Sequence, residues 1–368
     1  MLWRSLRGRT LRVAITGAGI TLTSLLVLVL TAAHRSLVES VRDYAGQPTI
    51  DLWVAPEGTD NLIRSSGLLP SWTDDSIMAT PGVAAVGPLV RGFLTVSSAT
   101  NSGRPLTLMG IGIKPNALGG PPTLRAGRNP TGAEETALDR AAAYRLNVGL
   151  DDTVLVNGTP NVVVGLTSGT NLLATQFAFF DLDAVRLSLG MPERYSFVAV
   201  QLEPGADRSI VIHRLASRLH HVEIMTRDSF VANNVREVAA GILPVMRLVG
   251  LLGITVAAVL VVLLIQGMVE ELRGEIAVLL AVGASAGSLG ILLPLRAGVL
   301  AVAGVAAGSA AARLLALILD RVAPTVALSF AWDDDLRILG IFVAAAVLAA
   351  AIPVARLRRL DPLEAFRP

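Results

Sequence analysis

Four stretches of the chain lack acidic and basic side chains over lengths that few soluble folds contain. A helix needs about 20 apolar residues to cross the roughly 30 Å of hydrocarbon in a bilayer. The stretches are Val13–Ala33, Leu248–Val269, Ile276–Leu319 (interrupted only by Arg296 and Arg313) and Ile338–Ala355, and each approaches or exceeds that length. With 52% hydrophobic residues and a mean hydropathy of +0.61, the sequence predicts an α-helical membrane protein with four transmembrane helices, one plus three, and a large domain between the first two.

The arginines that flank these stretches predict the orientation of the chain. The first stretch follows arginines at positions 4, 7, 9 and 12 with no acidic residue among them, and the tail carries four more at positions 356, 358, 359 and 367. Arginine is enriched on the cytoplasmic side of membrane proteins, so both termini are expected there and the number of crossings must be even. Counting Ile276–Leu295 as a separate fifth crossing would break this rule. The segment before residue 288 is therefore predicted to be a cytoplasmic amphipathic helix and turn.

A cleaved signal peptide is the alternative for the N-terminus, because Thr31, Ala32 and Ala33 resemble a cleavage site. Signal sequences have an apolar region of about 7–15 residues, which is shorter than Val13–Ala33. The sequence therefore favours an uncleaved anchor. The predicted boundaries are a cytoplasmic segment 1–12, helix 13–33, external domain 34–242, helix 243–269, cytoplasmic coupling segment 270–287, helix 288–319, external loop 320–337, helix 338–355 and tail 356–368.

The external segment has the composition of a folded domain, with 17 basic and 20 acidic residues between His34 and Ile242. Its pattern predicts an α+β domain with a stalk helix at each end, His34–Ala45 and Phe230–Ile242. Alternating side chains predict a strand at Ile50–Val54, and Asn157-Gly158 predicts a hairpin turn between strands at 153–156 and 162–164. Helical periodicity predicts helices over Glu134–Leu146 and Ile210–Leu219.

Two residue counts exclude several kinds of chemistry. There is no cysteine, which removes disulfides, thiolate nucleophiles and cysteine-bound metals. The only lysine is Lys114, between Ile113 and Pro115, so no phosphate-binding P-loop exists, because that loop requires a Gly-Lys-Ser/Thr sequence. Any nucleotide-driven work must therefore use a nucleotide hydrolysed by another subunit. The near balance of 31 basic and 29 acidic residues also argues against a nucleic-acid partner.

Several patterns resemble functional motifs but have a simpler interpretation. Gly283–Gly287 matches the G-x-S-x-G motif of serine hydrolases, but no strand precedes it and small residues suit a tight turn between helices. His213 and His220 share a helical face, yet no third ligand accompanies them, so we interpret them as surface residues. The acidic run Asp333–Asp335 is expected to place negative charge at the N-terminus of the last helix.

Two polar residues form a candidate site inside the membrane. Arg296 and Gln266 interrupt apolar stretches, and a charge in hydrocarbon is costly unless it faces protein, water or headgroups. Arg313 is expected to extend to the headgroups. The same stretch also carries glycines at positions 298, 304 and 308, which predict close packing against another helix.

The segment from Met268 to Ser285 resembles the coupling helix of FtsX/MacB-type ABC transporter permeases, with its charged cluster Glu270-Glu271-Leu272-Arg273, then Glu275-Ile276, then an apolar run ending Ala281-Val282-Gly283-Ala284-Ser285. Further matches are the start Leu6–Arg12, the segment Leu138–Gly158 and the ending Asp361-Pro362-Leu363-Glu364-Ala365, so the resemblance extends along the chain. Asp151 stands where the family usually has glycine, and Arg296 lies where relatives often carry an acidic or polar residue, so no role is transferred to it. The strand at Asp51–Val54 is similar to the DevC and HrtB subgroup.

The resemblance implies a non-catalytic permease subunit of an ABC transporter in a bacterial cytoplasmic membrane. It implies a separate cytoplasmic ATPase, which binds ATP and Mg²⁺, while this chain is expected to bind no cofactor directly. It also implies a homodimer or pseudo-symmetric heterodimer of permeases that contacts membrane lipid and an external accessory protein. The implied ATPase-coupling residues are Glu270, Glu271, Arg273, Glu275, Ile276, Leu279 and Gly283. The expected activity is export or extraction of a hydrophobic substrate such as a lipid, lipoprotein, haem-like molecule, drug or peptide. The alternative is an FtsX-like signal relay that activates a cell-wall hydrolase without transport.

Overall fold

The structure is a computed structural model of the 368-residue chain. It describes residues 2–63, 67–100, 104–170, 176–271, 286–322 and 327–357. For residues 2–12, 242, 264–265, 268–271, 286–293, 321 and 351–357 within those ranges, it describes the backbone only.

The chain divides into two compact units. The helical unit comprises Met1–His34, Ile242–Ile318 and Leu328–Pro368, and the sheet unit comprises Arg35–Gly241 and Leu319–Ala327. Three helices belong to both units: α1 runs without interruption over Leu2–Ala45, α6 over Arg227–Glu271 and α8 over Ala286–Val322. The two units are described separately below.

The sheet unit is built on a mixed sheet of ten strands within the described residues. Nine of them follow the order β12-β1-β11-β3-β4-β9-β6-β8-β5, and β7 pairs with both β3 and β8. Most pairs are antiparallel, but β4 with β9 and β6 with β8 are parallel. The strands are β1 Leu52–Pro56, β3 Val83–Ser98, β4 Leu106–Ile113, β5 Thr123–Gly127, β6 Glu135–Asp139, β7 Thr153–Val156, β8 Thr159–Ser168, β9 Phe177–Asp181, β11 Phe197–Leu202 and β12 Val222–Thr226, and a separate small pair is β2 Leu69–Pro70 with β10 Arg194–Tyr195.

Four short helices complete the sheet unit: α2 Thr73–Met78, α3 Arg140–Leu146, α4 Leu182–Ser188 and α5 Arg208–Arg218. Three of them begin at an aspartate whose carboxylate accepts backbone N–H groups of the first turn, namely Asp139, Asp181 and Asp207. Such caps satisfy donors that have no partner within the helix. This explains why each helix begins directly after its aspartate.

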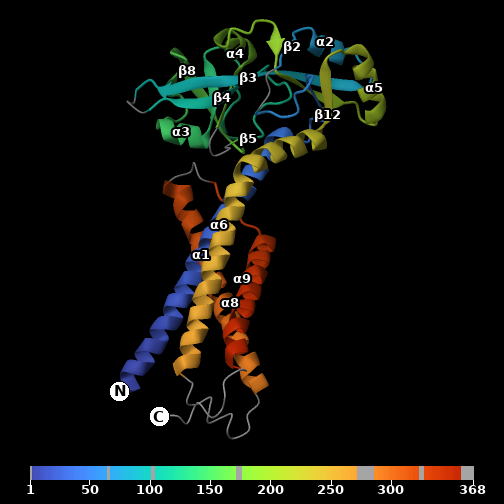
Figure 1. Ribbon diagram of the computed structural model, residues 1–368. Coiled ribbons are helices and arrows are strands. Elements are labelled where there is room, and N and C mark those ends of the chain that lie inside the picture. The colour runs from blue at the N-terminus through green and yellow to red at the C-terminus, as the bar shows by residue number, and fades with distance from the viewer. Residues whose placement is uncertain are drawn as a thin grey trace. The chain divides into compact units, whose positions relative to one another are not determined.

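The central strands bury both of their faces, and each face has a different cover. Side chains alternate along a strand, so Leu52 and Val54 of β1 pack into one core and Trp53 and Ala55 into the other. The first core contains apolar residues of α2, α3, α4 and α5. The second core contains the last residues of α1 and the first residues of α6. Within the sheet unit, Figure 1 shows α2 and α4 on one side of the strands and these helix ends on the other.

The hairpin, the first strand and the helix at α5 confirm the sequence-based predictions. Asn157 and Gly158 both have positive φ, 48° and 89°, as a tight hairpin turn between β7 and β8 requires. The predicted helix over Glu134–Leu146 is wrong in its first half, because Glu135–Asp139 form strand β6 between β8 and β9. Pairing on both sides outweighs the weak helical preference of this short run. Only Arg140–Leu146 is helical.

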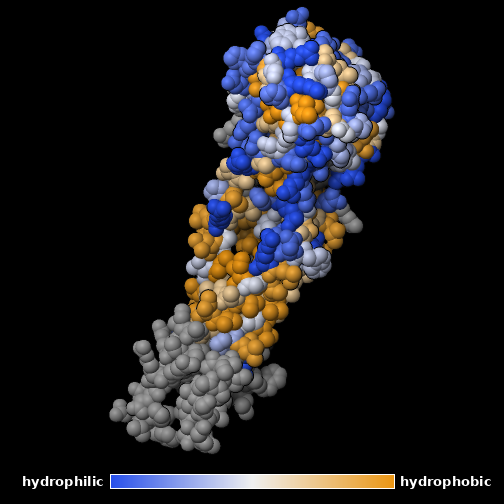
Figure 2. Space-filling view, turned by 90° about the vertical axis from the view of Figure 1, so that its right-hand side faces the viewer, coloured by the Kyte–Doolittle hydropathy of each residue, from blue (hydrophilic) through white to orange (hydrophobic). Residues whose placement is uncertain are grey.

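The helical unit contains parts of α1, α6 and α8 together with the whole of α9 Trp332–Leu357. Three segments are long and apolar enough to cross a membrane: Val13–Ala45, Leu243–Leu263 and Pro294–Asp320. Figure 2 shows apolar side chains covering much of the visible surface of these helices. The fourth predicted crossing, Ile338–Ala355, lies in α9 and extends beyond residue 350, the last residue of this helix whose side chain the structure describes. It therefore stays a prediction.

Close contact between α1 and α8 confirms the packing role predicted for two of the glycines. A Cβ atom on Gly304 would lie 2.6 Å from Ile20 Cγ2, and one on Gly308 would lie 2.9 Å from the Thr21 carbonyl oxygen. Real Cβ atoms do not approach other atoms so closely, so only glycine fits at these two positions. Small residues at helix crossings are typical of packing within a bilayer.

Candidate functional site

The last turn of α1 and the first turns of α6 meet in an aromatic cluster on one face of the sheet. We call this the junction; its members are Tyr44, Trp53, Phe177, Phe179, Phe197 and Phe230. Trp53 of β1 is fully buried, and its indole Nε1 donates to the carbonyl oxygen of Ala45 at 3.0 Å. Its ring lies 4.7 Å from the ring of Phe230 in α6, measured between centroids. One strand residue therefore contacts both helices.

Tyr44 fixes α1 to the centre of the sheet unit. Its ring packs edge-on against Phe177 at 5.2 Å, and its hydroxyl donates to the carbonyl oxygen of Gly119 at 3.0 Å. Gln47, just beyond the helix, donates to the next carbonyl, that of Gly120, at 2.9 Å. Aromatic pairs of this kind contribute about 0.5–1.5 kcal/mol each beyond the area they bury.

Asn234 fixes α6 in a similar way. Its side chain is 1% exposed, and its Oδ1 atom accepts the backbone N–H of Leu62 at 2.7 Å. Its Nδ2 atom donates to the carbonyl oxygen of Phe230 one turn earlier in α6 at 2.8 Å. A buried amide with both ends bonded positions its neighbours strongly, because breaking either bond leaves a buried polar group without a partner.

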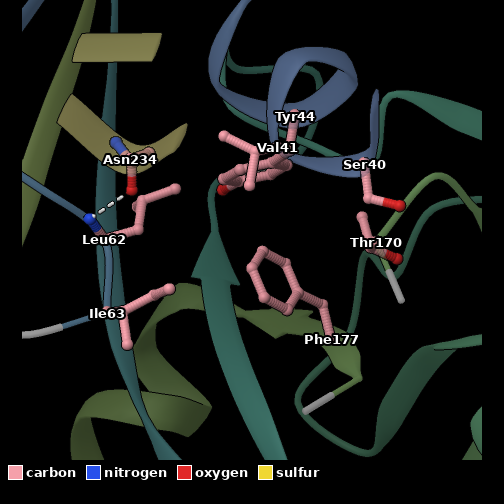
Figure 3. Close-up of a pocket in the computed structure, with 8 residues that line it drawn as sticks. All are labelled: Ser40, Val41, Tyr44, Leu62, Ile63, Thr170, Phe177 and Asn234. Carbon is pink, nitrogen blue, oxygen red and sulfur yellow. Dashed lines mark hydrogen bonds between the residues drawn. The ribbon is translucent and has the colours of Figure 1, made fainter. Parts of the chain in front are cut away.

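An apolar hollow opens beside the junction, between α1 and the loop that follows β1 (Figure 3). Its walls include Val41, Leu62, Ile63 and Phe177, and the ring of Tyr44 lies against them. The volume of its cavity is about 10 Å³, which is space for no more than about one water molecule. The lining surface that remains accessible there is apolar, and we assign no ligand to a space of this size.

A second polar cluster lies within the helical unit and joins α8 to α9. The guanidinium of Arg313 bonds both carboxylate oxygens of Asp335, and Ser309 Oγ donates to Asp335 Oδ1 at 2.8 Å. The guanidinium carbon also lies 4.8 Å from the ring centroid of Trp332 and 5.4 Å from that of Phe330. Asp335 offers Arg313 a mostly buried partner with matching geometry. The expectation that Arg313 extends to the headgroups stays a prediction.

The acidic run at the start of α9 has two roles. Asp333, Asp334 and Asp335 all lie in the first turn of the helix, as predicted, where negative charge interacts favourably with the helix dipole. Asp335 also holds Arg313, which the sequence interpretation missed. Charged residues 22 positions apart give no local signal of pairing.

Asp139 and Glu135, at either end of strand β6, have shifted pKa values. Burial raises the pKa of Asp139, although its bonds to Thr170 and to the N–H of Ala141 act in the opposite direction. The guanidinium of Arg128 and the backbone N–H groups of Thr131 and Gly132 lower the pKa of Glu135 to about 2. Both residues bond within the sheet unit, where Asp139 caps α3 and Glu135 closes the loop before β6, so we assign neither a chemical role.

The predicted ATPase-coupling residues mostly lie outside the described residues. Glu270 and Glu271 end α6 with undescribed side chains, and Arg273, Glu275, Ile276, Leu279 and Gly283 fall in the gap from 272 to 285, as does most of the G-x-S-x-G motif. In the predicted intramembrane pair, Gln266 is half-buried and Arg296 is exposed, and neither bonds another described residue through its side chain. That these two residues form an intramembrane polar site stays a prediction.

Three histidines, His213, His220 and His221, lie at the surface of the sheet unit. His213 is part of α5, and His221 contacts Glu57 through Nδ1 at 2.8 Å. Within the described ranges, no group of three or more His, Cys, Asp or Glu side chains could hold a metal ion.

Comparison with known proteins identifies the family. Residues 13–218 match the model of the MacB-like periplasmic core domain, and residues 247–362 match that of the FtsX-like permease C-terminal region. Two solved structures are similar at low identity. The extracellular domain of the noncanonic ABC-type transporter YknZ from Gram-positive bacteria shares 16% identity at a TM-score of 0.38, over 48% of this chain and 98% of that one. The periplasmic region of MacB from Actinobacillus actinomycetemcomitans shares 16% identity at a TM-score of 0.41, over 52% of this chain and 94% of that one. No curated protein matches the sequence.

The chain matches the two family models in order, and it combines membrane-spanning helices with an external α+β domain. Together these features define a permease component of an ABC transporter. The chain belongs to the FtsX/MacB-like permease family, and the first family model alone covers more than half of it. Members of this family are non-catalytic membrane components of ABC systems, which implies a partner ATPase.

Proposed function

We propose that this chain transmits the ATP-driven closure of a separate ATPase to its external domain, and that the movement exports or extracts a hydrophobic or amphiphilic substrate. The observation that carries the proposal is the junction, where Trp53 contacts both α1 and α6. Each helix is continuous from residues of the helical unit to this cluster. A displacement of either helix along its axis would therefore act directly on strand β1.

The packing of the junction favours a mechanical role over a flexible tether. Tyr44, Trp53 and Phe230 are each at most 2% exposed, and two of them hydrogen-bond to backbone carbonyls. Packed aromatic side chains of this kind resist independent movement of the parts that they join. A tether without a force-bearing role would need only a loop between the helix and the strand.

The remaining parts of the proposal follow from the family and the sequence. Helix α9 would provide a fourth crossing, with both termini in the cytoplasm and the sheet unit outside. The coupling segment 270–287 would dock on the ATPase through Glu271, Arg273 and Glu275, and ATP and Mg²⁺ would be bound by that partner. Two permease chains, identical or paired as a heterodimer, would act together in a lipid bilayer, and an accessory protein would meet the external domain.

The test is co-purification of the detergent-solubilised chain, followed by an ATPase assay of whatever accompanies it. We expect about one soluble ATPase per permease, and we expect Glu275→Lys to abolish substrate-stimulated turnover without lowering expression. Glu134→Lys is the matched control. It makes the same charge reversal at an exposed residue of the sheet unit, away from the coupling segment. Unchanged turnover in Glu275→Lys would overturn the docking assignment. An intact chain with no ATPase would favour an ATP-independent membrane receptor.

A further inference from the structure

The end of α8 is bonded to helix α3 within the sheet unit. Leu319–Ala327 belong to the sheet unit, so the last turn of α8 lies there, although most of the helix belongs to the helical unit. Arg140 and Tyr144 lie four residues apart in α3 and share one face of it. The Arg140 guanidinium donates to Asp320 Oδ1 at 2.9 Å, and the Tyr144 hydroxyl donates to the carbonyl oxygen of Val322 at 2.6 Å. Two polar bonds therefore join α3 to the last turn of α8.

Both bonds suit the C-terminus of a helix. Val322 is the last residue of α8, and a carbonyl oxygen at this position has no partner within a helix. A negative charge in the last turn interacts unfavourably with the helix dipole, so Asp320 is stabilised by a nearby cation, which Arg140 supplies. Arg140 and Tyr144 therefore cap α8 from another helix.

This contact differs from the junction because it buries little of the side chains that make it. The exposed fractions are 55% for Arg140, 71% for Asp320, 51% for Tyr144 and 64% for Val322. Exposed ion pairs are weak, since water and salt screen them. The aromatic side chains of the junction, by contrast, are each at most 2% exposed. The contact between α3 and α8 can therefore open at a small cost in free energy, whereas the junction cannot.

We propose that the contact between α3 and the end of α8 is a releasable latch, closed in one nucleotide state of the transporter and open in another. The proposal rests on the proposed function, in which the ATPase displaces the membrane helices. Helix α8 is continuous from Ala286 to Val322, so a displacement along its axis would move Asp320 and Val322 away from α3. The junction would keep α1 and α6 attached to the sheet unit while the latch opens.

Cross-linking of the full chain with a carbodiimide tests the latch. Arg140→Lys places an amine beside the exposed carboxylate of Asp320, and the reagent joins the two as an amide while it takes up the water that is lost. The only natural lysine is Lys114, so the cross-linked peptide is distinct in mass spectrometry.

The chain is studied with its co-purified ATPase in phosphatidylcholine nanodiscs, either without nucleotide or with Mg²⁺ and a non-hydrolysable ATP analogue. Coupling between two sites typically amounts to about 5–150-fold, so we expect the initial cross-linking rate to differ about fivefold or more between the two states. Equal rates in the two states would overturn the proposal.

Two further variants show whether the cross-link reports this contact. Arg145→Lys adds the same amine to α3 at an exposed residue that bonds Gln176 instead, so it should form no cross-link to Asp320. Tyr144→Phe, added to the Arg140→Lys chain, removes only the hydroxyl that bonds Val322. One hydrogen bond shifts an equilibrium by about two- to tenfold, so the rate should fall about threefold in the state with the faster reaction. An unchanged rate there, or an equal cross-link from Arg145→Lys, would also overturn the proposal.

The failure of the latch can be told apart from the failure of the proposed function. Equal cross-linking rates in the two nucleotide states, in a chain that co-purifies with an active ATPase, remove only the latch. A chain that binds no ATPase removes both proposals, because no ATP-driven movement is then left for the latch to follow.

Discussion

The two units of this permease hold their helices by opposite means. In the helical unit, α1 and α8 approach so closely that Gly304 and Gly308 have no room for a Cβ atom. In the sheet unit, the last turn of the same α1 is held by Tyr44 and Trp53, two of the largest fully buried side chains. Helix α1 thus packs through small residues along one part of its length and through large aromatic residues at its end.

The difference follows from the solvent around each unit. Between helices in lipid there is little hydrophobic driving force, so contact depends on close packing and on polar bonds such as Arg313 with Asp335. In water, burial of apolar area stabilises by about 25 cal/mol per Å², and large aromatic residues bury most. Large-to-small changes should therefore damage the sheet unit most, and small-to-large changes should damage the helical unit.

The largest effect should come from Trp53→Ala. Removing a fully buried indole leaves a cavity between α1, β1 and α6 and should cost about 3–5 kcal/mol of unfolding free energy. Thermal unfolding and limited proteolysis of the purified chain in detergent would measure it. Trp72→Ala is the control, because Trp72 is 56% exposed and its loss should cost less than about 0.5 kcal/mol. Equal losses in the two variants would contradict the role of the junction.

A smaller effect should follow from breaking the ion pair of the helical unit. Arg313→Ala leaves the mostly buried Asp335 without its cation and should cost about 2–3 kcal/mol, measured as thermal stability in detergent. Replacing both partners, Arg313→Met with Asp335→Leu, should recover most of the loss, because no buried charge then remains. Arg337→Ala is the control, since Arg337 is 74% exposed and lies 3.8 Å from Asp333. No recovery in the double variant would show that the pair has a role beyond neutralising Asp335.

The third prediction reverses the direction of the first. Gly308→Leu should cost about 1–2 kcal/mol, because the new side chain meets Ser24 and Thr21 of α1 and forces the helices apart. Gly250→Leu makes the same change on α6, where a Cβ atom meets nothing within 4 Å, and should be nearly neutral. Since the natural chain has no cysteine, disulfide trapping between engineered cysteines on α1 and α8 would report the helix distance. Unchanged trapping in Gly308→Leu would argue against tight packing at this crossing.

The same contrast explains what could be predicted from the sequence. Membrane helices follow from local composition, so the uncharged stretches identified three of them, and a single dipeptide, Asn157-Gly158, identified the hairpin. The small residues of α8 also predicted its close packing. Each of these signals is contained in a short window of sequence.

The junction and the ion pair could not be predicted in this way. Asn234 bonds a residue 172 positions away, and Tyr44 bonds one 75 positions away, so their roles depend on how the sheet brings distant segments together. Strand β6 was mistaken for a helix for the same reason, since its neighbours β8 and β9 follow it in the sequence. The alternation at Leu52, Trp53 and Val54 did indicate a strand, but not which helices cover it.

The smallest expected effect concerns an ion pair that faces water. Glu135 has its pKa lowered to about 2 by Arg128 and two backbone N–H groups, from an ordinary value of 4.5. Its bonds therefore stabilise the fold fully above about pH 4.5, and this contribution is lost as the pH falls through 2. Glu135→Gln should lower the unfolding temperature slightly at pH 7 and less at pH 3. The control is Glu134→Gln at the exposed neighbouring residue, which should leave the unfolding temperature unchanged at both pH values.

Salt separates this pair from Arg313 with Asp335. The Arg128 side chain is 54% exposed, whereas Asp335 is 12% exposed. Screening weakens exposed pairs far more than buried ones. At about 1 M salt the Debye length is about 3 Å. At pH 7 this salt concentration should remove most of the difference in unfolding temperature between Glu135→Gln and the natural chain. The difference in unfolding temperature between Arg313→Ala and the natural chain should stay nearly unchanged. Equal salt sensitivity of the two pairs would mean that water reaches Asp335 as freely as it reaches Glu135, and the contrast between the units would then rest on the glycines and aromatic residues alone.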